Sequence, residues 1–202
     1  MTNRQFLWGL ANGVMVLAIA GAFWLGLGIG MFASQIGGLA CAALTAFQVA
    51  GCGVLLWGAI RLRRRAGFHR SELRLGDGRA RLETRHVVAV IRWTTGLQAL
   101  ATAGAVWWCV RAHADRFIWP SIGMIVSLHL IPLARVFHVR AYYVTAVAGT
   151  AVSLVAVAFL PRAYALLGLA TGMAAVMWIS AAYLLTNAAG VAERALRDEW
   201  AV

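Results

Sequence analysis

The chain has 202 residues, of which 62% are hydrophobic and only 12% are charged, and its mean hydropathy is +0.77. A soluble domain carries roughly 25% charged residues, so this composition excludes an ordinary soluble protein and indicates a membrane protein. All eighteen basic residues are arginines; they outnumber the seven acidic residues and give a formal net charge of +11.

Six apolar stretches are long enough to cross a bilayer as helices, because a crossing helix needs about 20 mostly apolar residues. They lie at 7–28, 37–60, 87–110, 118–137, 142–160 and 164–185. Only helices and closed barrels satisfy their backbone polar groups inside a bilayer, and the alternation of polar and apolar residues that a barrel requires is absent. We therefore predict a single all-α membrane domain, a bundle of six transmembrane helices.

The first stretch contains Ala18-Ile19-Ala20, a pattern found at signal-peptide cleavage sites. Its apolar run continues to about Phe32, beyond the length of a signal-peptide core, so we expect it to remain as a transmembrane helix. The three cysteines lie within or at the ends of the predicted helices. An odd number gives no disulfide framework, and we expect them to be small buried side chains.

The positions of the arginines predict the orientation. The only sizeable connection, 61–86, carries nine of them, and with the ends assigned to its side the count is fourteen against three on the opposite side. Because basic residues concentrate in cytoplasmic segments, we predict that the N-terminus, the C-terminus, loop 61–86 and tail 187–202 are cytoplasmic. The arginines that follow the second helix directly are expected to contact anionic lipids: Arg61, Arg63, Arg64 and Arg65. We do not expect nucleic acid as a partner.

Small residues at four-residue spacing predict how the helices pack, since close contact between smooth faces drives helix association in lipid. The longest such stripe is in the second helix: Gly38, Ala42, Ala46 and Ala50. Shorter stripes are Gly9 and Gly13, Gly168 and Gly172, and Thr145, Gly149 and Ser153. We expect contacts within the chain, with a homo-oligomer or another membrane protein as the alternative use.

All seven acidic residues lie outside the predicted helices. Ion-coupled carriers and proton pumps usually need a buried carboxylate, so we do not expect these activities. The fourth stretch instead holds His129 near its middle and Arg135 roughly 9 Å further along the helix. Pro132 between them has no N–H for the carbonyl of Leu128, which predicts a helix kink.

Two interpretations of the polar residues inside the membrane remain open. In the first, Arg92 and Arg135 extend to the headgroups, and His129 hydrogen-bonds to Gln98 or Gln48. In the second, these five residues line a site for an anionic small molecule or an acidic lipid headgroup, which the two arginines bind without a carboxylate partner.

Metal and haem chemistry lack the residues that they need. His86 and His138 lie at the membrane boundary, and His129 has no histidine at its own depth with which to hold a haem. No H-E-x-x-H pattern or cluster of Cys, His and Asp is present. We therefore expect no cofactor, no metal and no catalytic residue, and do not predict an enzyme.

The stretch "HLIPLARVFHVRAYYVTAVAG" resembles small multi-pass bacterial membrane proteins of uncharacterised function with the pattern H-x-x-P-L-A-R-x-F followed by Y-Y-x-T. The matching residues are His129, Pro132, Leu133, Ala134, Arg135, Phe137, Tyr142, Tyr143 and Thr145. Ala146 stands where the pattern has glycine, and the match covers about a tenth of the chain. The resemblance implies a bacterial inner-membrane protein and brings no activity with it.

Taken together, these patterns predict a membrane protein that binds or transports an anionic or amphiphilic ligand near the cytoplasmic leaflet. The alternative is a non-catalytic membrane partner or assembly subunit.

Overall fold

The structure is a computed structural model that describes residues 3–65, 78–137 and 139–199, with side chains for 9–35, 37–64, 88–137, 139–161 and 164–188. Every regular element in these ranges is a helix. In chain order they are α1 (Asn3–Ile36), α2 (Gly38–Arg65), α4 (Gly78–Arg111), the short 3₁₀ helix η1 (Asp115–Phe117), α5 (Ile118–Leu128), α6 (Leu130–Phe137), α7 (Arg140–Ala158) and α8 (Arg162–Glu199).

Five segments are long and apolar enough to cross a membrane, so the chain is an all-helical, multi-pass membrane protein. They are Gly9–Gln35, Gly38–Arg64, Asp115–Phe137, Arg140–Ala158 and Tyr164–Ala188. The predicted stretch 87–110 is not among them, although α4 is as long as α1. Its hydropathy is reduced by Arg92, Thr94 and Gln98, which lie where the other helices carry apolar residues.

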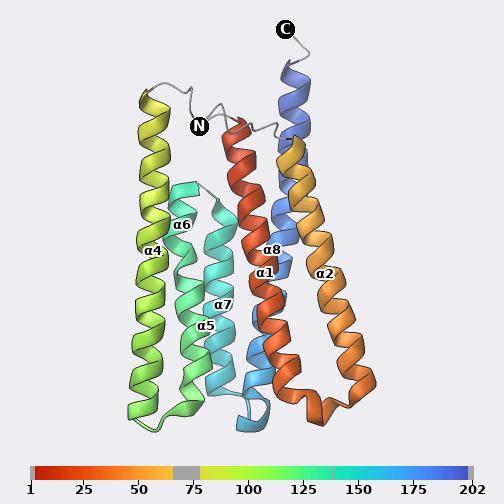
Figure 1. Ribbon diagram of the computed structural model, residues 1–202, viewed down its shortest axis with the longest axis vertical. Helices are drawn as coiled ribbons and strands as arrows, with labels where there is room; N and C mark the ends of the chain where they lie inside the picture. The colour runs from red at the N-terminus through yellow and green to blue at the C-terminus, as the bar shows by residue number, and fades with distance from the viewer. Residues whose placement is uncertain (1–2, 66–77, 138, 200–202) are drawn as a thin grey trace.

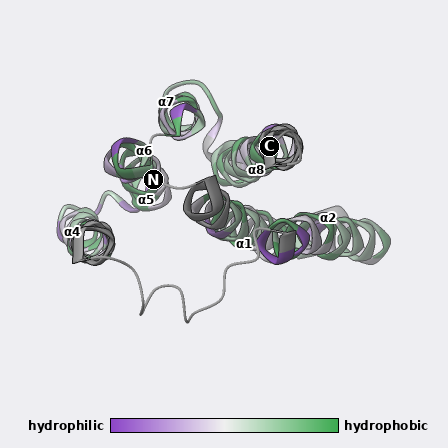
Figure 2. Cartoon of the chain, turned by 90° about the horizontal axis from the view of Figure 1, so that it is seen from above, coloured by the Kyte–Doolittle hydropathy of each residue, from purple (hydrophilic) through white to green (hydrophobic). Residues whose placement is uncertain are grey.

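The helices run side by side along one axis, and α1 begins at the end of the bundle where α8 ends (Figure 1). Helix α1 packs mainly on α8 and α2, α7 packs on α5, α6 and α8, and α4 packs mainly on α5 and α6. As a result α2 and α4, which follow one another in the sequence, lie at opposite edges of the bundle (Figure 2). At the other end, Gly37 joins α1 to α2 with a φ of +75°, a conformation that glycine adopts without a steric penalty.

Trp178 of α8 holds α1, α2 and α8 together. Its indole ring lies against two glycines, Gly21 of α1 and Gly51 of α2; a Cβ on Gly51 would be 2.8 Å from the ring. The indole Nε1 donates a hydrogen bond to the carbonyl of Ala18 at 3.1 Å. Two glycines in neighbouring helices thus make room for one large side chain with a satisfied polar atom.

The contact between α5 and α7 uses small residues reciprocally. Ser127 of α5 packs on Gly149 of α7, and Ser153 of α7 packs on Gly123 of α5. Each serine hydroxyl donates to a carbonyl four residues earlier in its own helix, at 2.8 Å for Ser127 and 2.9 Å for Ser153. The predicted packing role of the stripe Thr145, Gly149 and Ser153 is confirmed, because all three are buried.

The two shorter glycine stripes are also covered within the chain. Gly13 of α1 lies against Tyr142 of α7, and Gly172 of α8 lies against Val152 of α7. The stripe of α2 behaves differently: Gly38, Ala42, Ala46 and Ala50 are all exposed. The expectation that this stripe packs within the chain is wrong, because α2 contacts α1 and α8 through other faces.

Three boundaries differ from those expected. Helix α2 continues to Arg65 and α4 begins at Gly78, so both ends of the predicted loop 61–86 are helical; residues 66–77 lie outside the described ranges. The predicted tail 187–202 continues α8 without a break as far as Glu199. The fourth stretch is divided into α5 and α6 at His129, three residues before Pro132.

Candidate ligand-binding seam between α4 and α5–α6

One face of α4 is turned toward the bundle. Within 88–110 the residues that are not exposed are Val90, Thr94, Gln98, Thr102, Ala105, Val106 and Cys109. This spacing of three and four residues places them on a single helical face, and the main neighbours of α4 are α5 and α6. Because Thr94, Gln98 and Thr102 belong to it, this face of α4 is partly polar.

The segment α5–α6 has two covered faces. The buried face packs toward α7 and the core and consists of Pro120, Gly123, Ser127, Leu130 and Ala134. On the opposite side runs a half-buried stripe of Ile118, Ile122, Ile125, His129, Pro132 and Val136. Since α4 packs on this segment from outside the core, the half-buried stripe is the one that faces α4. We call the contact between the two stripes the seam.

His129 and Gln98 lie at the same depth in the seam. Gln98 is thirteen residues from the end of α4 at Arg111, and His129 is twelve residues from the end of η1 at Phe117. At 1.5 Å per residue both are roughly 18–20 Å from the connection that joins the two helices. The two residues therefore lie at the same level of the packed helices, each on the stripe assigned to the seam.

The helix break at His129 leaves a polar atom without a partner. The His129 backbone N–H donates to the carbonyl of Ile125 at 3.0 Å, while Pro132 has no N–H to offer the carbonyl of Leu128. The imidazole lies beside the backbone of Val126, but its buried Nδ1 forms no hydrogen bond of good geometry; in the described part of the chain the only other such side-chain atom is Oγ1 of Thr150. A buried polar group left unpaired costs about 1–3 kcal/mol, so a native chain that retains one calls for an explanation.

The two glutamines predicted to bond to His129 have different surroundings. Gln48 donates from Nε2 to the carbonyl of Ala22 at 2.9 Å, which fixes α2 to α1 at the edge of the bundle away from α4. It is not part of the seam. Gln98 is half-buried, and among the described residues its amide forms no hydrogen bond.

The two candidate arginines are exposed but face different ways. Arg92 lies about 160° around α4 from Thr94, so it points away from the seam and is not brought to Arg135. Arg135 lies about 60° around α6 from Pro132, at the exposed edge of the seam and near the end of α6. No ion pair to either arginine forms among the described residues.

The arginines that end α2 lie outside the seam. Arg61, Arg63 and Arg64 are exposed, and the Arg61 guanidinium lies 5.3 Å from the centre of the Trp57 ring. Tryptophan and arginine together are typical of the membrane–water boundary. The side chain of Arg65 lies outside the described residues. Among the residues that the structure does describe, no group of three His, Cys, Asp or Glu side chains comes together to hold a metal ion.

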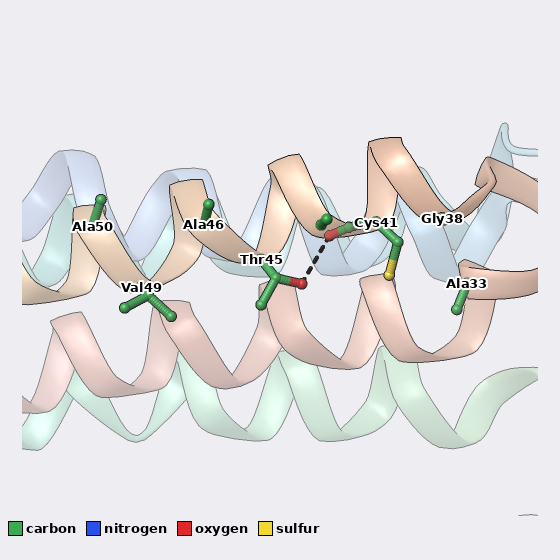
Figure 3. Close-up of a pocket in the computed structure, with 8 residues that line it drawn as sticks. Ala33, Gly38, Cys41, Thr45, Ala46, Val49 and Ala50 are labelled. Carbon is green, nitrogen blue, oxygen red and sulfur yellow. Dashed lines mark hydrogen bonds between the residues drawn. The ribbon is translucent and has the colours of Figure 1, made fainter.

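A second feature is a shallow groove on the outward face of α2. It is lined by Ala33, Gly38, Cys41, Ala42, Thr45, Ala46, Val49 and Ala50; Figure 3 shows all of them on α2 except Ala33, which lies on the neighbouring α1. The Thr45 hydroxyl donates to the carbonyl of Cys41 at 2.8 Å, so the groove offers no unsatisfied polar group there.

Sequence reasoning found His129, Gln98 and Arg135 but missed Thr94 and Thr102. The signal was present: Thr94, Gln98 and Thr102 are four residues apart and share one face. Comparison with protein-family models, curated proteins and solved structures finds no match to this chain.

Proposed function

We propose that this protein binds an anionic amphiphile and that the seam is the binding site. The ligand comes from the leaflet at the end of the bundle that carries Arg61, Arg63, Arg64 and Arg135, which we call the arginine-rich end. The observation that carries the proposal is the buried, unpaired Nδ1 of His129, which lies on the stripe facing the polar side of α4. A ligand that hydrogen-bonds there would satisfy the atom that the protein leaves unpaired.

The position of Arg135 supports an amphiphile rather than a small anion in the bundle interior. Arg135 is exposed near the end of α6, roughly 9 Å along the axis from His129. An acidic headgroup can pair with its guanidinium, while the body of the same molecule extends into the seam. Because α4 stands at the edge of the bundle, the seam borders directly on lipid.

This function needs α4 to cross the membrane as well, which brings the number of crossings to six. The polar stripe of α4 is then turned to α5–α6 and away from lipid. Both termini and the arginine-rich end are cytoplasmic, following the distribution of basic residues, and the membrane is the bacterial inner membrane. Whether the ligand is only bound or also moved across the bilayer depends on whether the seam opens at both ends.

Thermal unfolding of the purified protein in detergent tests the proposal. The probes are phosphatidate, phosphatidylglycerol and inorganic phosphate, against wild type, Arg135→Ala and the matched control Arg92→Ala. A ligand at a hundred times its Kd stabilises by about 2.7 kcal/mol. We expect an acidic lipid to raise the Tm of wild type and of Arg92→Ala, and to have much less effect on Arg135→Ala. Absence of a shift with every probe would contradict the proposal.

A second candidate function, a membrane partner or assembly subunit, is favoured by the α2 groove. Of the small-residue stripes predicted from the sequence, it is the one that no other described part of the chain covers. Ala42→Leu or Ala46→Leu should then abolish association with the partner, whereas Arg135→Ala should leave it unchanged. Co-purification or size measurement in mild detergent distinguishes the two candidates.

A further inference from the structure

We infer that the occupant of the seam is an acyl lipid, whose ester or amide carbonyl accepts hydrogen bonds from His129 and Gln98. This inference rests on the proposed function and names the class of ligand. It follows from which hydrogen-bonding groups the seam still has available and from the depth at which they lie.

The available groups are donors. A neutral imidazole carries its proton on either nitrogen, so Nδ1 can donate, and the amide of Gln98 has two N–H groups. Thr94 adds no further donor, because its hydroxyl proton is already directed at the carbonyls of Val90 and Ile91 at 2.8 and 3.1 Å. A ligand atom that only accepts, such as a carbonyl oxygen, is complementary to these donors.

The depth excludes most other acceptors. His129 lies one and a half turns deeper in the membrane than Arg135, a separation of roughly 9 Å along the helix. A free phosphate has no second group to reach that far, whereas the glycerol backbone of a phospholipid joins the headgroup phosphate to acyl carbonyls that lie deeper. Any difference between this separation and the distance from the phosphate to the acyl carbonyl is taken up by the flexible side chain of Arg135.

The rest of the seam suits an acyl chain. Beyond His129 toward the opposite leaflet, the stripe of α5 continues as Ile125, Ile122 and Ile118, and the stripe of α4 continues past Thr102 as Ala105 and Val106. These side chains are almost all apolar and half-buried. A tail that follows them would cover surface that α4 leaves accessible, without burying any new polar group.

The test compares two lipids that differ only at the carbonyl. One is a diacyl phosphatidate; the other is its dialkyl ether analogue, which has the same headgroup and chain length but no carbonyl. Binding is measured on the full-length protein in detergent by native mass spectrometry. We expect the ester lipid to bind wild type about tenfold more tightly, which corresponds to about 1.4 kcal/mol. This preference should fall below about threefold, or roughly 0.6 kcal/mol, in His129→Phe and in Gln98→Leu.

Gln48→Leu is the matched control, because Gln48 is also a half-buried glutamine inside the membrane but lies outside the seam. It should retain the ester preference. If His129→Phe does not fold, Gln98→Leu carries the test, since Gln98 is half-buried on a helix at the edge of the bundle and is not part of the core.

Equal binding of ester and ether lipids to wild type would overturn the inference and leave the proposed function standing. The inference would also be overturned if inorganic phosphate stabilised the protein as strongly as the lipid does. Failure of both lipids to bind would overturn the proposed function as well.

Discussion

Replacement of Gly149 by alanine tests the packing of the bundle most severely. A Cβ at this position would overlap the Oγ of Ser127 and lie 3.1 Å from the Ser127 Cβ and 3.4 Å from the Met173 Sδ. Ser127 and Met173 are fully buried, so neither can move aside freely. Overpacking of a tight core costs about 1–3 kcal/mol, and the helix propensity of alanine returns at most about 1 kcal/mol. We expect a net destabilisation of about 1–2 kcal/mol.

The double variant shows whether Ser127 is the cause. Ser127→Ala alone removes a hydroxyl that bonds only weakly outside its own helix, to the Met173 sulfur at 4.0 Å, so its effect should be small. In the Gly149→Ala background the same change removes the overlapping atom. Residues in direct contact show coupling energies of 0.5–3 kcal/mol, and we expect at least about 1 kcal/mol of rescue here.

The assay is equilibrium unfolding in mixed micelles, followed by tryptophan fluorescence. Gly53→Ala serves as control, because Gly53 is exposed on α2 and a Cβ there would meet nothing within 4 Å. It should be neutral or slightly stabilising. If Gly149→Ala behaves like Gly53→Ala, or if Ser127→Ala gives no rescue, the reciprocal packing of α5 on α7 is refuted.

Three further variants test other contacts by the same unfolding measurement. Trp178→Phe loses the hydrogen bond to the carbonyl of Ala18 and should cost about 1 kcal/mol; no loss would mean that this hydrogen bond does not stabilise the fold. Gln48→Leu removes the bond to the carbonyl of Ala22 and should cost roughly 0.6 kcal/mol, the average for hydrogen bonds between membrane helices. A larger cost would indicate a buried network around Gln48. Ala46→Leu adds bulk to an exposed position and should change the free energy of unfolding by less than about 0.5 kcal/mol, whereas a clear loss would place the α2 stripe inside the folded chain.

The helices themselves could be predicted from the sequence because length and hydropathy decide them. Five of the six predicted stretches correspond to segments with the length and hydropathy of membrane helices. The sixth, 87–110, forms part of α4, whose polar stripe reduces its hydropathy. The tail differs in one respect: the spacing of Glu193 and Arg197 predicts a short helix of its own, whereas α8 continues without a break as far as Glu199.

The partners of each helix could not be predicted to the same extent. A stripe of small residues indicates that close approach is sterically allowed, and it does not name the neighbour. The stripe of Thr145, Gly149 and Ser153 is buried, whereas the equally regular stripe from Gly38 to Ala50 is exposed. The difference lies in the arrangement of the bundle, in which α7 packs on α5, α6 and α8 through this stripe's side, whereas α2 stands at an edge and packs through other faces.

Counting residues along the chain predicts the level of a candidate residue but not the direction in which it points. It predicts that Arg92 and Arg135 lie at similar levels on neighbouring helices. It did not show that Arg92 points away from α5–α6, because that depends on which face of α4 packs. The four-residue spacing of Thr94, Gln98 and Thr102 marks the polar face of α4. Only the structure shows that this face packs on α5 and α6, because they are the neighbours of α4.

The orientation of α4 against His129 is the central claim, and cross-linking in the membrane tests it most directly. Gln98→Cys and His129→Cys are combined in a variant whose three native cysteines are replaced by alanine, and treated with a short bifunctional thiol reagent. After trypsin cleavage at Arg111 and Arg116, we expect the peptides that contain positions 98 and 129 to remain joined. The matched pair Leu100→Cys and His129→Cys should give little product, because Leu100 lies close to the level of Gln98 but on the exposed face of α4. Efficient joining through position 100 in place of position 98 would contradict the orientation of α4, and with it the seam.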